Sequence, residues 1–175
     1  MFLGLDLSLC GTGVVIIDSD GNYTEKLIKS NPPKIKNPTT EVRRLMKIRD
    51  EIKSAIMTER IEIATIEGIS YMSKNSTSTS QLSGLNYMVR EMLMKIGIPF
   101  VIVAPTSLKK FATGKGNCGK DVMMLEIYKR WGVSILNDNV ADAYALARAA
   151  EAVNKELKLT GPQKEVINLL RQQTE

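Results

Sequence analysis

The sequence of 175 residues contains no histidine. This absence excludes Ser-His-Asp triads, His-activated cysteines and metal sites built from two or three imidazoles. General acid–base chemistry would therefore fall to carboxylates, to lysines or to metal-bound water. The two cysteines, Cys10 and Cys118, form no C-x-x-C pair and supply neither a zinc site nor a disulfide framework. Reduced thiols in an intracellular protein are the natural interpretation.

Long hydrophobic runs are missing too. The first six residues lack a basic segment and already include the carboxylate of Asp6, and no apolar run approaches the roughly 18 residues that a membrane-spanning helix needs. We therefore expect a protein that is neither exported nor embedded in a membrane. Aromatic residues make up only 5% of the chain, but 43% hydrophobic and 25% charged residues are typical of a soluble globular protein and speak against disorder.

Chain length and charge set two further bounds. A chain of 175 residues is long enough for one domain of ordinary size. We expect that domain to span residues 1–155, followed by a helical extension over residues 156–175 that either belongs to the same domain or forms a tail. Lysine and arginine outnumber aspartate and glutamate by 24 to 19, and this net charge of +5 suits a polyanionic partner.

The order of the predicted elements indicates a mixed α/β fold. Short segments rich in apolar residues predict five strands, of which the first three are antiparallel. These strands cover residues 2–8, 14–17, 23–29, 61–67 and 99–103. A turn is expected at Cys10–Gly13, a helix between Val42 and Ile56, and a second helix ending near Gly97. The remainder is mostly helical, so we expect one five-stranded mixed sheet flanked by helices.

Three carboxylates stand out because their neighbours are apolar or small. Asp6 lies in the first strand, where a buried carboxylate must be paired, protonated or bound to a cation, unless it caps the Cys10–Gly13 turn instead. Glu67 is the last residue of a strand. Its side chain lies either at the edge of the sheet where ligands bind or in solvent. Asp142 is the only acid in residues 140–150, a helix suited to close packing, although an exposed helical aspartate would also fit.

Asp138 and Asn139 stand at the start of the same helix. Both residue types are common N-caps, and Asp138 also shares a helical face with Asp142 one turn on. Carboxylates from an early strand, a later strand and a late helix, with no imidazole, suit a hard cation such as Mg²⁺ or Mn²⁺. Two such ions about 3.5–4 Å apart can activate water and stabilise the leaving oxygen of a phosphodiester.

Basic residues cluster in two segments. Eight lie within residues 25–49 with two acids, and four lie between Lys109 and Lys120 with none. Most such runs are solvated surface, but the second is more informative because its lysines stand among glycines, where the backbone can approach a phosphate. The pattern G-x-x-x-x-G-K over residues 114–120 is not a nucleotide-binding P-loop, since Asp121 replaces Ser or Thr and no apolar strand precedes it. We therefore expect no nucleotide cofactor.

Four segments, taken in order, carry a family resemblance. They are Gly4–Gly13, Ile66–Gly68, Ala104–Lys120 and Asp138–Ala143. They resemble, respectively, the opening strand and turn, the strand-end glutamate, the basic segment and the closing acidic helix of the RuvC-like Holliday-junction resolvases. The likeness extends from residue 3 to about residue 150, and the four motifs are jointly specific. It implies a ribonuclease H-like fold, a homodimer, and metal-dependent nicking of two strands of like polarity at a four-way DNA junction.

The resemblance also implies site residues. Asp6, Glu67 and Asp142 would bind Mg²⁺, with two ions per site and Mn²⁺ able to substitute. Lys120 would contact DNA close to the scissile phosphate and take part in catalysis. The other implied DNA contacts are Lys109, Lys110, Lys115, Tyr71 and Lys74.

The fourth metal position is ambiguous. The family's register falls on Asn139, whereas Asp138 lies one residue earlier. We favour Asp138, because four carboxylates balance two divalent cations better than three carboxylates and a neutral amide.

Three alternatives are weighed against this interpretation. Similar Asp-led Gly-Thr-Gly turns occur in sugar kinases and actin-like ATPases, but those proteins need two such domains and this chain is too short. A nucleic-acid-binding module without chemistry would not need the three acids. A related nuclease acting on structured RNA precursors, or on branched DNA generally, is the runner-up. The expected location is the cytoplasm or the nucleoid, and a viral or organellar origin is compatible.

Overall fold

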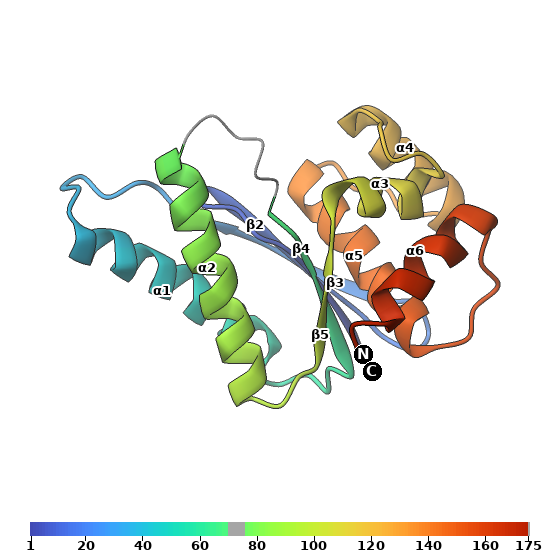
Figure 1. Cartoon of the computed structure of the whole chain (residues 1–175), viewed down its shortest axis with the longest axis horizontal. Coiled ribbons are helices and arrows are strands. Elements are labelled where there is room, and N and C mark those ends of the chain that lie inside the picture. The colour runs from blue at the N-terminus through green and yellow to red at the C-terminus, as the bar shows by residue number, and fades with distance from the viewer. Residues whose placement is uncertain (70–75, 175) are drawn as a thin grey trace.

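The computed structural model describes residues 1–69 and 76–174. Five strands form one sheet in the order β3-β2-β1-β4-β5 (Figure 1). The strands are β1 (Phe2–Asp6), β2 (Gly11–Ile17), β3 (Tyr23–Lys29), β4 (Ile63–Glu67) and β5 (Phe100–Val103). The first three are antiparallel neighbours, whereas β4 runs parallel to β1 and β5 parallel to β4. The mixed five-stranded sheet predicted from the sequence is therefore confirmed.

Helices cover both faces of the sheet (Figure 1). One face carries α1 (Pro38–Ile56) and α2 (Ser76–Lys95). The other carries α3 (Pro105–Thr113), α4 (Lys120–Trp131), α5 (Asp138–Asn154) and α6 (Gly161–Arg171). Side chains alternate along β1, so that Phe2 enters the core under α5 while Leu3 and Leu5 enter the core under α1 and α2. None of the described helices is long and apolar enough to cross a membrane.

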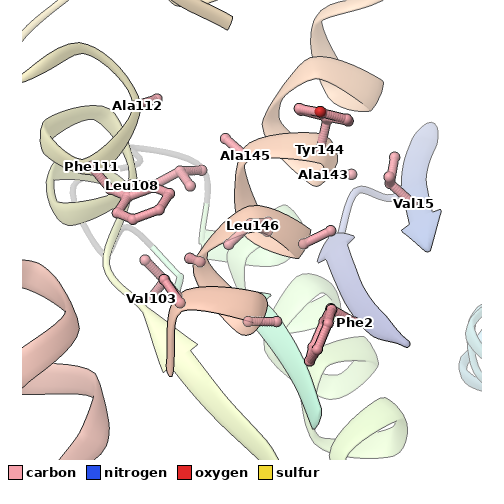
Figure 2. Close-up of a cluster of buried hydrophobic side chains, with 14 of the residues drawn as sticks. Phe2, Val15, Val103, Leu108, Phe111, Ala112, Ala143, Tyr144, Ala145 and Leu146 are labelled. Carbon is pink, nitrogen blue, oxygen red and sulfur yellow. The ribbon is translucent and has the colours of Figure 1, made fainter. Parts of the chain in front are cut away.

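Helix α5 is the centre of the second core. Its residues Ala143, Tyr144, Ala145 and Leu146 are fully buried and lie between the sheet and α3 (Figure 2). The hydroxyl of Thr65 on β4 donates a hydrogen bond of 2.6 Å to the carbonyl oxygen of Leu146. This buried bond fixes the position of α5 along the sheet, because an unmade hydrogen bond inside the core would be costly.

Two glycines let α5 approach the sheet closely. A Cβ atom at Gly4 on β1 would lie 2.0 Å from the carbonyl oxygen of Ala143, and one at Gly13 on β2 would lie 2.2 Å from that of Asn139. Neither glycine has a positive φ, so neither is required by a turn. Their function is to leave room for the helix backbone, which brings the first turns of α5 against the end of β1.

The turn between β1 and β2 falls earlier than the sequence predicted. We expected a turn over Cys10–Gly13, but Gly11 already begins β2. The side chains of Ser8 and Thr12 build the turn instead. Thr12 Oγ1 donates to the Ser8 carbonyl oxygen at 2.8 Å and accepts from the Ser8 N–H at 3.1 Å. The prediction was wrong because it treated glycines that serve helix packing as turn residues.

The segment after α5 packs on the same core. Val166, Ile167 and Leu170 of α6 are buried with the residues under α5. Farther on, the side-chain amide of Gln173 pairs with the backbone of Ile102 on β5. Its oxygen accepts from the Ile102 N–H and its nitrogen donates to the Ile102 carbonyl, both at 2.9 Å. These contacts tie α6 to the outer strand of the sheet.

Candidate active site

Three acidic side chains that the sequence singled out separately meet at one end of the sheet. Asp6 ends β1 and Glu67 ends β4, and these strands are parallel neighbours, so both residues lie at the same edge. Asp142 lies on the second turn of α5, which packs across β1 and β4. The three carboxyls are close enough that the charge of one raises the pKa of another.

Burial and mutual repulsion disfavour the ionised form of all three carboxyls. Burial is the main cause of the raised pKa of Asp6, which is only 7% exposed, and the charges of Glu67 and Asp142 raise it further. Burial and the charge of Asp142 likewise raise the pKa of Glu67. Burial, followed by the charge of Asp138, raises the pKa of Asp142 to about 6. The contact between the Asp6 and Glu67 carboxyls raises the pKa of Asp6 and opposes the rise in the pKa of Glu67.

These shifts predict how the stability of the metal-free protein depends on pH. A carboxyl whose pKa is raised by folding stabilises the fold fully below its unfolded pKa, near 4, and this contribution is lost as the pH rises through the folded value. For Asp142 the loss runs from about pH 4 to about pH 6, and Asp6 and Glu67, whose pKa values are also raised, extend it to higher pH. We expect the Tm in EDTA to fall by about 5–10 °C between pH 4.5 and 7.5.

Differential scanning fluorimetry of three proteins would check this expectation. Asp6→Asn should flatten the decline, because an amide has no proton to lose. Asp121→Asn is the matched control, since it replaces an exposed aspartate that does not line the pocket between these carboxyls. A Tm that is constant or rises over this pH range in EDTA would contradict the predicted direction.

Two lysines face the carboxylates across a pocket. Asp138, the first residue of α5, forms an ion pair with Lys120 at the start of α4. This contact lowers the pKa of Asp138 and raises that of Lys120. The positive charge of Lys109 on α3 partly opposes the rise in the pKa of Glu67 and of Asp142. Glu67, Asp142, Lys109 and Lys120 all line a pocket of about 350 Å³.

Two of the other predicted DNA contacts, Lys110 and Lys115, do not line this pocket. Lys110 turns toward α6 and forms an ion pair with Glu165. Lys115 is exposed in the connection between α3 and α4 and does not line the pocket. Tyr71 and Lys74 lie outside the described residues. The G-x-x-x-x-G-K segment follows helix α3 and not a strand, which agrees with its rejection as a P-loop.

The start of α5 distinguishes the two candidates for the fourth position. The N-cap of the helix is Asn137, whose side-chain oxygen accepts from the Val140 N–H at 3.2 Å, so Asp138 is not the capping residue. The charge of Asp138 raises the pKa of both Asp6 and Asp142. The amide nitrogen of Asn139 lies beside Gly11, 2.9 Å from where a Cβ would stand. Asp138 therefore faces the carboxylates, while Asn139 packs against β2.

Asn86 is a site residue that the sequence analysis missed. It lies on α2, is 1% exposed and lines the same pocket, and its Nδ2 donates to the backbone carbonyl of Glu67 at 3.3 Å. Because that carbonyl can only accept, the amide oxygen must face the other way, and it has no hydrogen-bond partner among the described residues. The sequence signal that could have indicated it is the position of the Asn86 amide between the buried residues Leu85 and Val89.

The donor set suits a hard divalent cation. It consists of carboxylate oxygens. These groups are buried close to one another, so that ionising each of them costs free energy unless a proton or a cation balances the charge. Within the described parts of the chain, the acidic and cysteine side chains do not converge into a ready-made cluster around one ion. In this arrangement Asp6 contacts Glu67, and Asp138 is paired with Lys120. A cation would have to replace these partners.

Comparison with known proteins identifies the family. A family model described as crossover junction endodeoxyribonuclease RuvC matches residues 2–149. The chain belongs to the RuvC family. The matched region contains all four acidic residues of the site and both pocket lysines, Lys109 and Lys120. The family resemblance stated from the sequence motifs is therefore confirmed.

Individual relatives extend over most of the chain. The crossover junction endodeoxyribonuclease RuvC of Chlamydia trachomatis is 28% identical over 170 residues, which cover 91% of this chain and 97% of the relative. RuvC of Treponema denticola is 30% identical over 151 residues, 83% of this chain and 82% of the relative. The structure of Thermus thermophilus RuvC in complex with a Holliday junction substrate matches with a TM-score of 0.68 and 19% identity, over 86% of this chain and 93% of that one. This structural likeness supports the RuvC fold.

Proposed function

We propose that this RuvC family member cuts four-way DNA junctions by metal-dependent phosphodiester hydrolysis. The observation that carries the proposal is the meeting of Asp6, Glu67 and Asp142, from three separate elements, beside a pocket that Glu67, Asp142, Lys109 and Lys120 line. Family membership over residues 2–149 supports the substrate class. Action on DNA would place the protein in the cytoplasm or at the nucleoid.

The carboxylates would hold Mg²⁺, with Mn²⁺ able to substitute, because all the donors are hard oxygen atoms. Two such ions per site, when bound, supply an activated water and neutralise charge on the leaving oxygen of the phosphodiester. Asp6, Glu67 and Asp142 must lose their protons to act as ligands. Since folding raises the pKa of each, metal affinity should increase with pH.

The pocket lysines would position the phosphate. Lys120 stands at the start of α4, and its side chain is 74% exposed although it is paired with Asp138. It can therefore exchange this partner for a DNA phosphate with little change in burial. Lys109 on the neighbouring helix adds a second positive charge to the same pocket. Together they offset the repulsion between the phosphate and the carboxylates.

Asp138 is proposed as the fourth carboxylate ligand. We expect Asp138→Asn to raise the Mg²⁺ concentration for half-maximal cleavage about ten-fold or more, with little change in Tm, because its ion pair is exposed and Asn137 keeps the helix cap. Asn139→Ala is the comparison and should have a smaller effect. Magnesium titrations of the cleavage rate would decide between them. Loss of activity in Asn139→Ala with a normal Asp138→Asn would assign the position to Asn139.

Asn86 is expected to position Glu67. Asn86→Ala removes the donor to the Glu67 carbonyl, so the end of β4 should lose its fixed orientation and the cleavage rate at saturating Mg²⁺ should fall about ten-fold. Junction affinity should change less than two-fold. The control is Asn154→Ala, which removes an amide bonded to the exposed carboxylate of Glu62. Equal loss of Tm and no loss of rate in both variants would show that Asn86 is only structural.

A homodimer completes the proposal, because paired nicks in two strands of like polarity require two sites. Purified protein would be incubated with Mg²⁺ and labelled four-way junction, flap, duplex and structured RNA, and its mass measured in solution. Paired nicks in the junction by a dimer are expected. Equal cutting of flaps would indicate a general branched-DNA nuclease. Cutting of RNA alone would overturn the proposal and favour an RNA-processing nuclease.

A further inference from the structure

A second hollow lies beside the carboxylate pocket. It measures about 370 Å³ and collects side chains from the β1–β2 turn, the loop before α1, the start of α1 and the first turns of α2. We call it the basic pocket. Its polar and charged lining includes Cys10, Lys36, Glu41, Arg44, Thr77 and Gln81.

The two pockets are lined by neighbouring residues of the same two segments. Leu7 lines the carboxylate pocket and Leu9, two residues on, lines the basic pocket. On α2, Leu82 lines the first and the adjacent Gln81 lines the second. The loop before α1, the start of α2 and the α3–α4 segment all lie toward the same end of the sheet (Figure 1). Both pockets therefore draw side chains from the β1–β2 connection and from the first turns of α2.

The surroundings of the basic pocket carry an excess of positive charge. The segment over residues 25–49 has eight basic and two acidic residues. Its exposed cations include Lys26, Lys29, Lys34, Lys36 and Arg43, and none of them takes part in an ion pair between described residues. Unpaired cations beside a hollow attract a polyanion.

Arg44 and Lys36 have different functions in this pocket. Arg44 belongs to its frame, because Nε donates to Ser30 Oγ at 3.1 Å and Nη2 donates to the carbonyl oxygens of Ser30 and Leu9. These bonds hold the β1–β2 turn against the end of β3. Lys36 is exposed and has no hydrogen bond to any described residue, so its charge is available to a ligand.

We propose that the basic pocket binds the phosphate backbone of the DNA strand whose cleavage site lies at the carboxylates. The inference rests on the proposed function and extends it. Lys109 and Lys120 come from helices on one face of the sheet, whereas Lys36 precedes α1 on the other face, so the strand would be held from both faces. The segments that both pockets share, the β1–β2 connection and the start of α2, favour DNA over an acidic protein as the occupant. Such contacts are independent of base sequence and sensitive to salt.

Glu41 gives the proposal a distinctive consequence. Its carboxylate lines the basic pocket, where it would repel a phosphate and weaken binding. Replacing it by the isosteric amide should therefore strengthen DNA binding, although it removes an acid that favours the first turn of α1. A residue with only a structural function would not give tighter binding when replaced.

The test measures the affinity of a fluorescein-labelled four-way junction by anisotropy, in EDTA so that no strand is cut. Lys36→Ala should weaken binding about five-fold near 0.1 M salt and lower the slope of log Kd against log salt by about one. Lys36→Glu should weaken binding more, and Glu41→Gln should tighten it. Lys95→Ala, at the far end of α2, is the matched control and should leave both quantities unchanged.

Two further measurements complete the design. The cleavage rate of Lys36→Ala at protein concentrations below the Kd should fall by the same factor as its affinity, because Lys36 does not line the carboxylate pocket and acts through binding. On junctions with progressively shorter arms, the difference between wild type and Lys36→Ala should disappear once the strand no longer reaches the basic pocket.

The outcomes separate this inference from the proposed function. Suppose that the wild type cuts junctions, but Lys36→Ala has the same affinity as the control Lys95→Ala, or Glu41→Gln weakens binding. Then the basic pocket does not bind DNA, and only this inference fails. If the wild type neither binds nor cuts any branched DNA, the proposed function fails as well. A Lys36→Ala defect that is independent of arm length would also overturn the inference.

Discussion

Asp142→Asn is expected to lower the single-turnover rate of junction cleavage at least about 1000-fold. A bound divalent cation supplies several kcal/mol of transition-state stabilisation, and each 1.36 kcal/mol corresponds to a factor of ten in rate. The amide keeps the shape of the side chain but loses the charge that holds the cation. Junction binding in EDTA should be unchanged or tighter, because a negative charge has been removed from a surface that faces phosphates.

The comparison variant is Asp121→Asn. Asp121 follows Lys120 on α4 and is exposed, and it does not line the carboxylate pocket. It should cut junctions at the wild-type rate. Full activity of Asp142→Asn, prepared free of wild-type protein, would refute the assignment of Asp142 as a ligand. Cleavage by the wild type that persists undiminished in EDTA would refute the metal requirement itself.

Gly4→Ala is expected to have the largest effect on stability. The added Cβ would stand 2.0 Å from the carbonyl oxygen of Ala143 and 2.4 Å from the backbone nitrogen of Ala147. Both atoms belong to the backbone of α5, so no side-chain rotation can relieve the overlap. We expect a loss of about 3 kcal/mol or more, a decrease in Tm of roughly 10 °C, or failure to accumulate as folded protein.

The measurement is thermal unfolding of Gly4→Ala and of a control variant, Gly161→Ala. A Cβ at Gly161 meets nothing within 4 Å, so that control should unfold near the wild-type temperature. A stable Gly4→Ala protein would mean that α5 can move away from β1. In that case Asp142 would move with the helix, and the cleavage rate should fall although the fold is retained.

The sheet was predictable because its signals are local. Alternation around Leu3 and Leu5 placed the first strand and the face occupied by Asp6, and both features hold in the structure. Acids among apolar neighbours were likewise visible one at a time, which is how Glu67 and Asp142 became candidates. What the sequence pattern could not show is which elements meet, since that depends on tertiary packing.

The errors have the same physical origin. The glycines at positions 11 and 13 were assigned to a turn because a sequence contains no information about Asn139 of α5, whose side chain packs on Gly11 and whose backbone packs on Gly13. The ion pair of Lys110 with Glu165 on α6 was also not visible in the sequence, because it joins residues 55 positions apart. Asn86 was overlooked because a buried amide acquires meaning only when the carbonyl of Glu67 is beside it.

The pairing of Gln173 with Ile102 has a consequence for self-association. β5 is the outer strand of the sheet, and an unpaired outer strand is a template on which another chain can add a strand and begin to aggregate. The Gln173 amide bonds both backbone groups that Ile102 turns outward, as a neighbouring strand would. A single side chain, unlike a strand, presents no further row of backbone N–H and C=O groups on which another chain could pair. The Gln173 side chain therefore caps this edge of the sheet and disfavours the addition of a strand from another copy of the chain to β5.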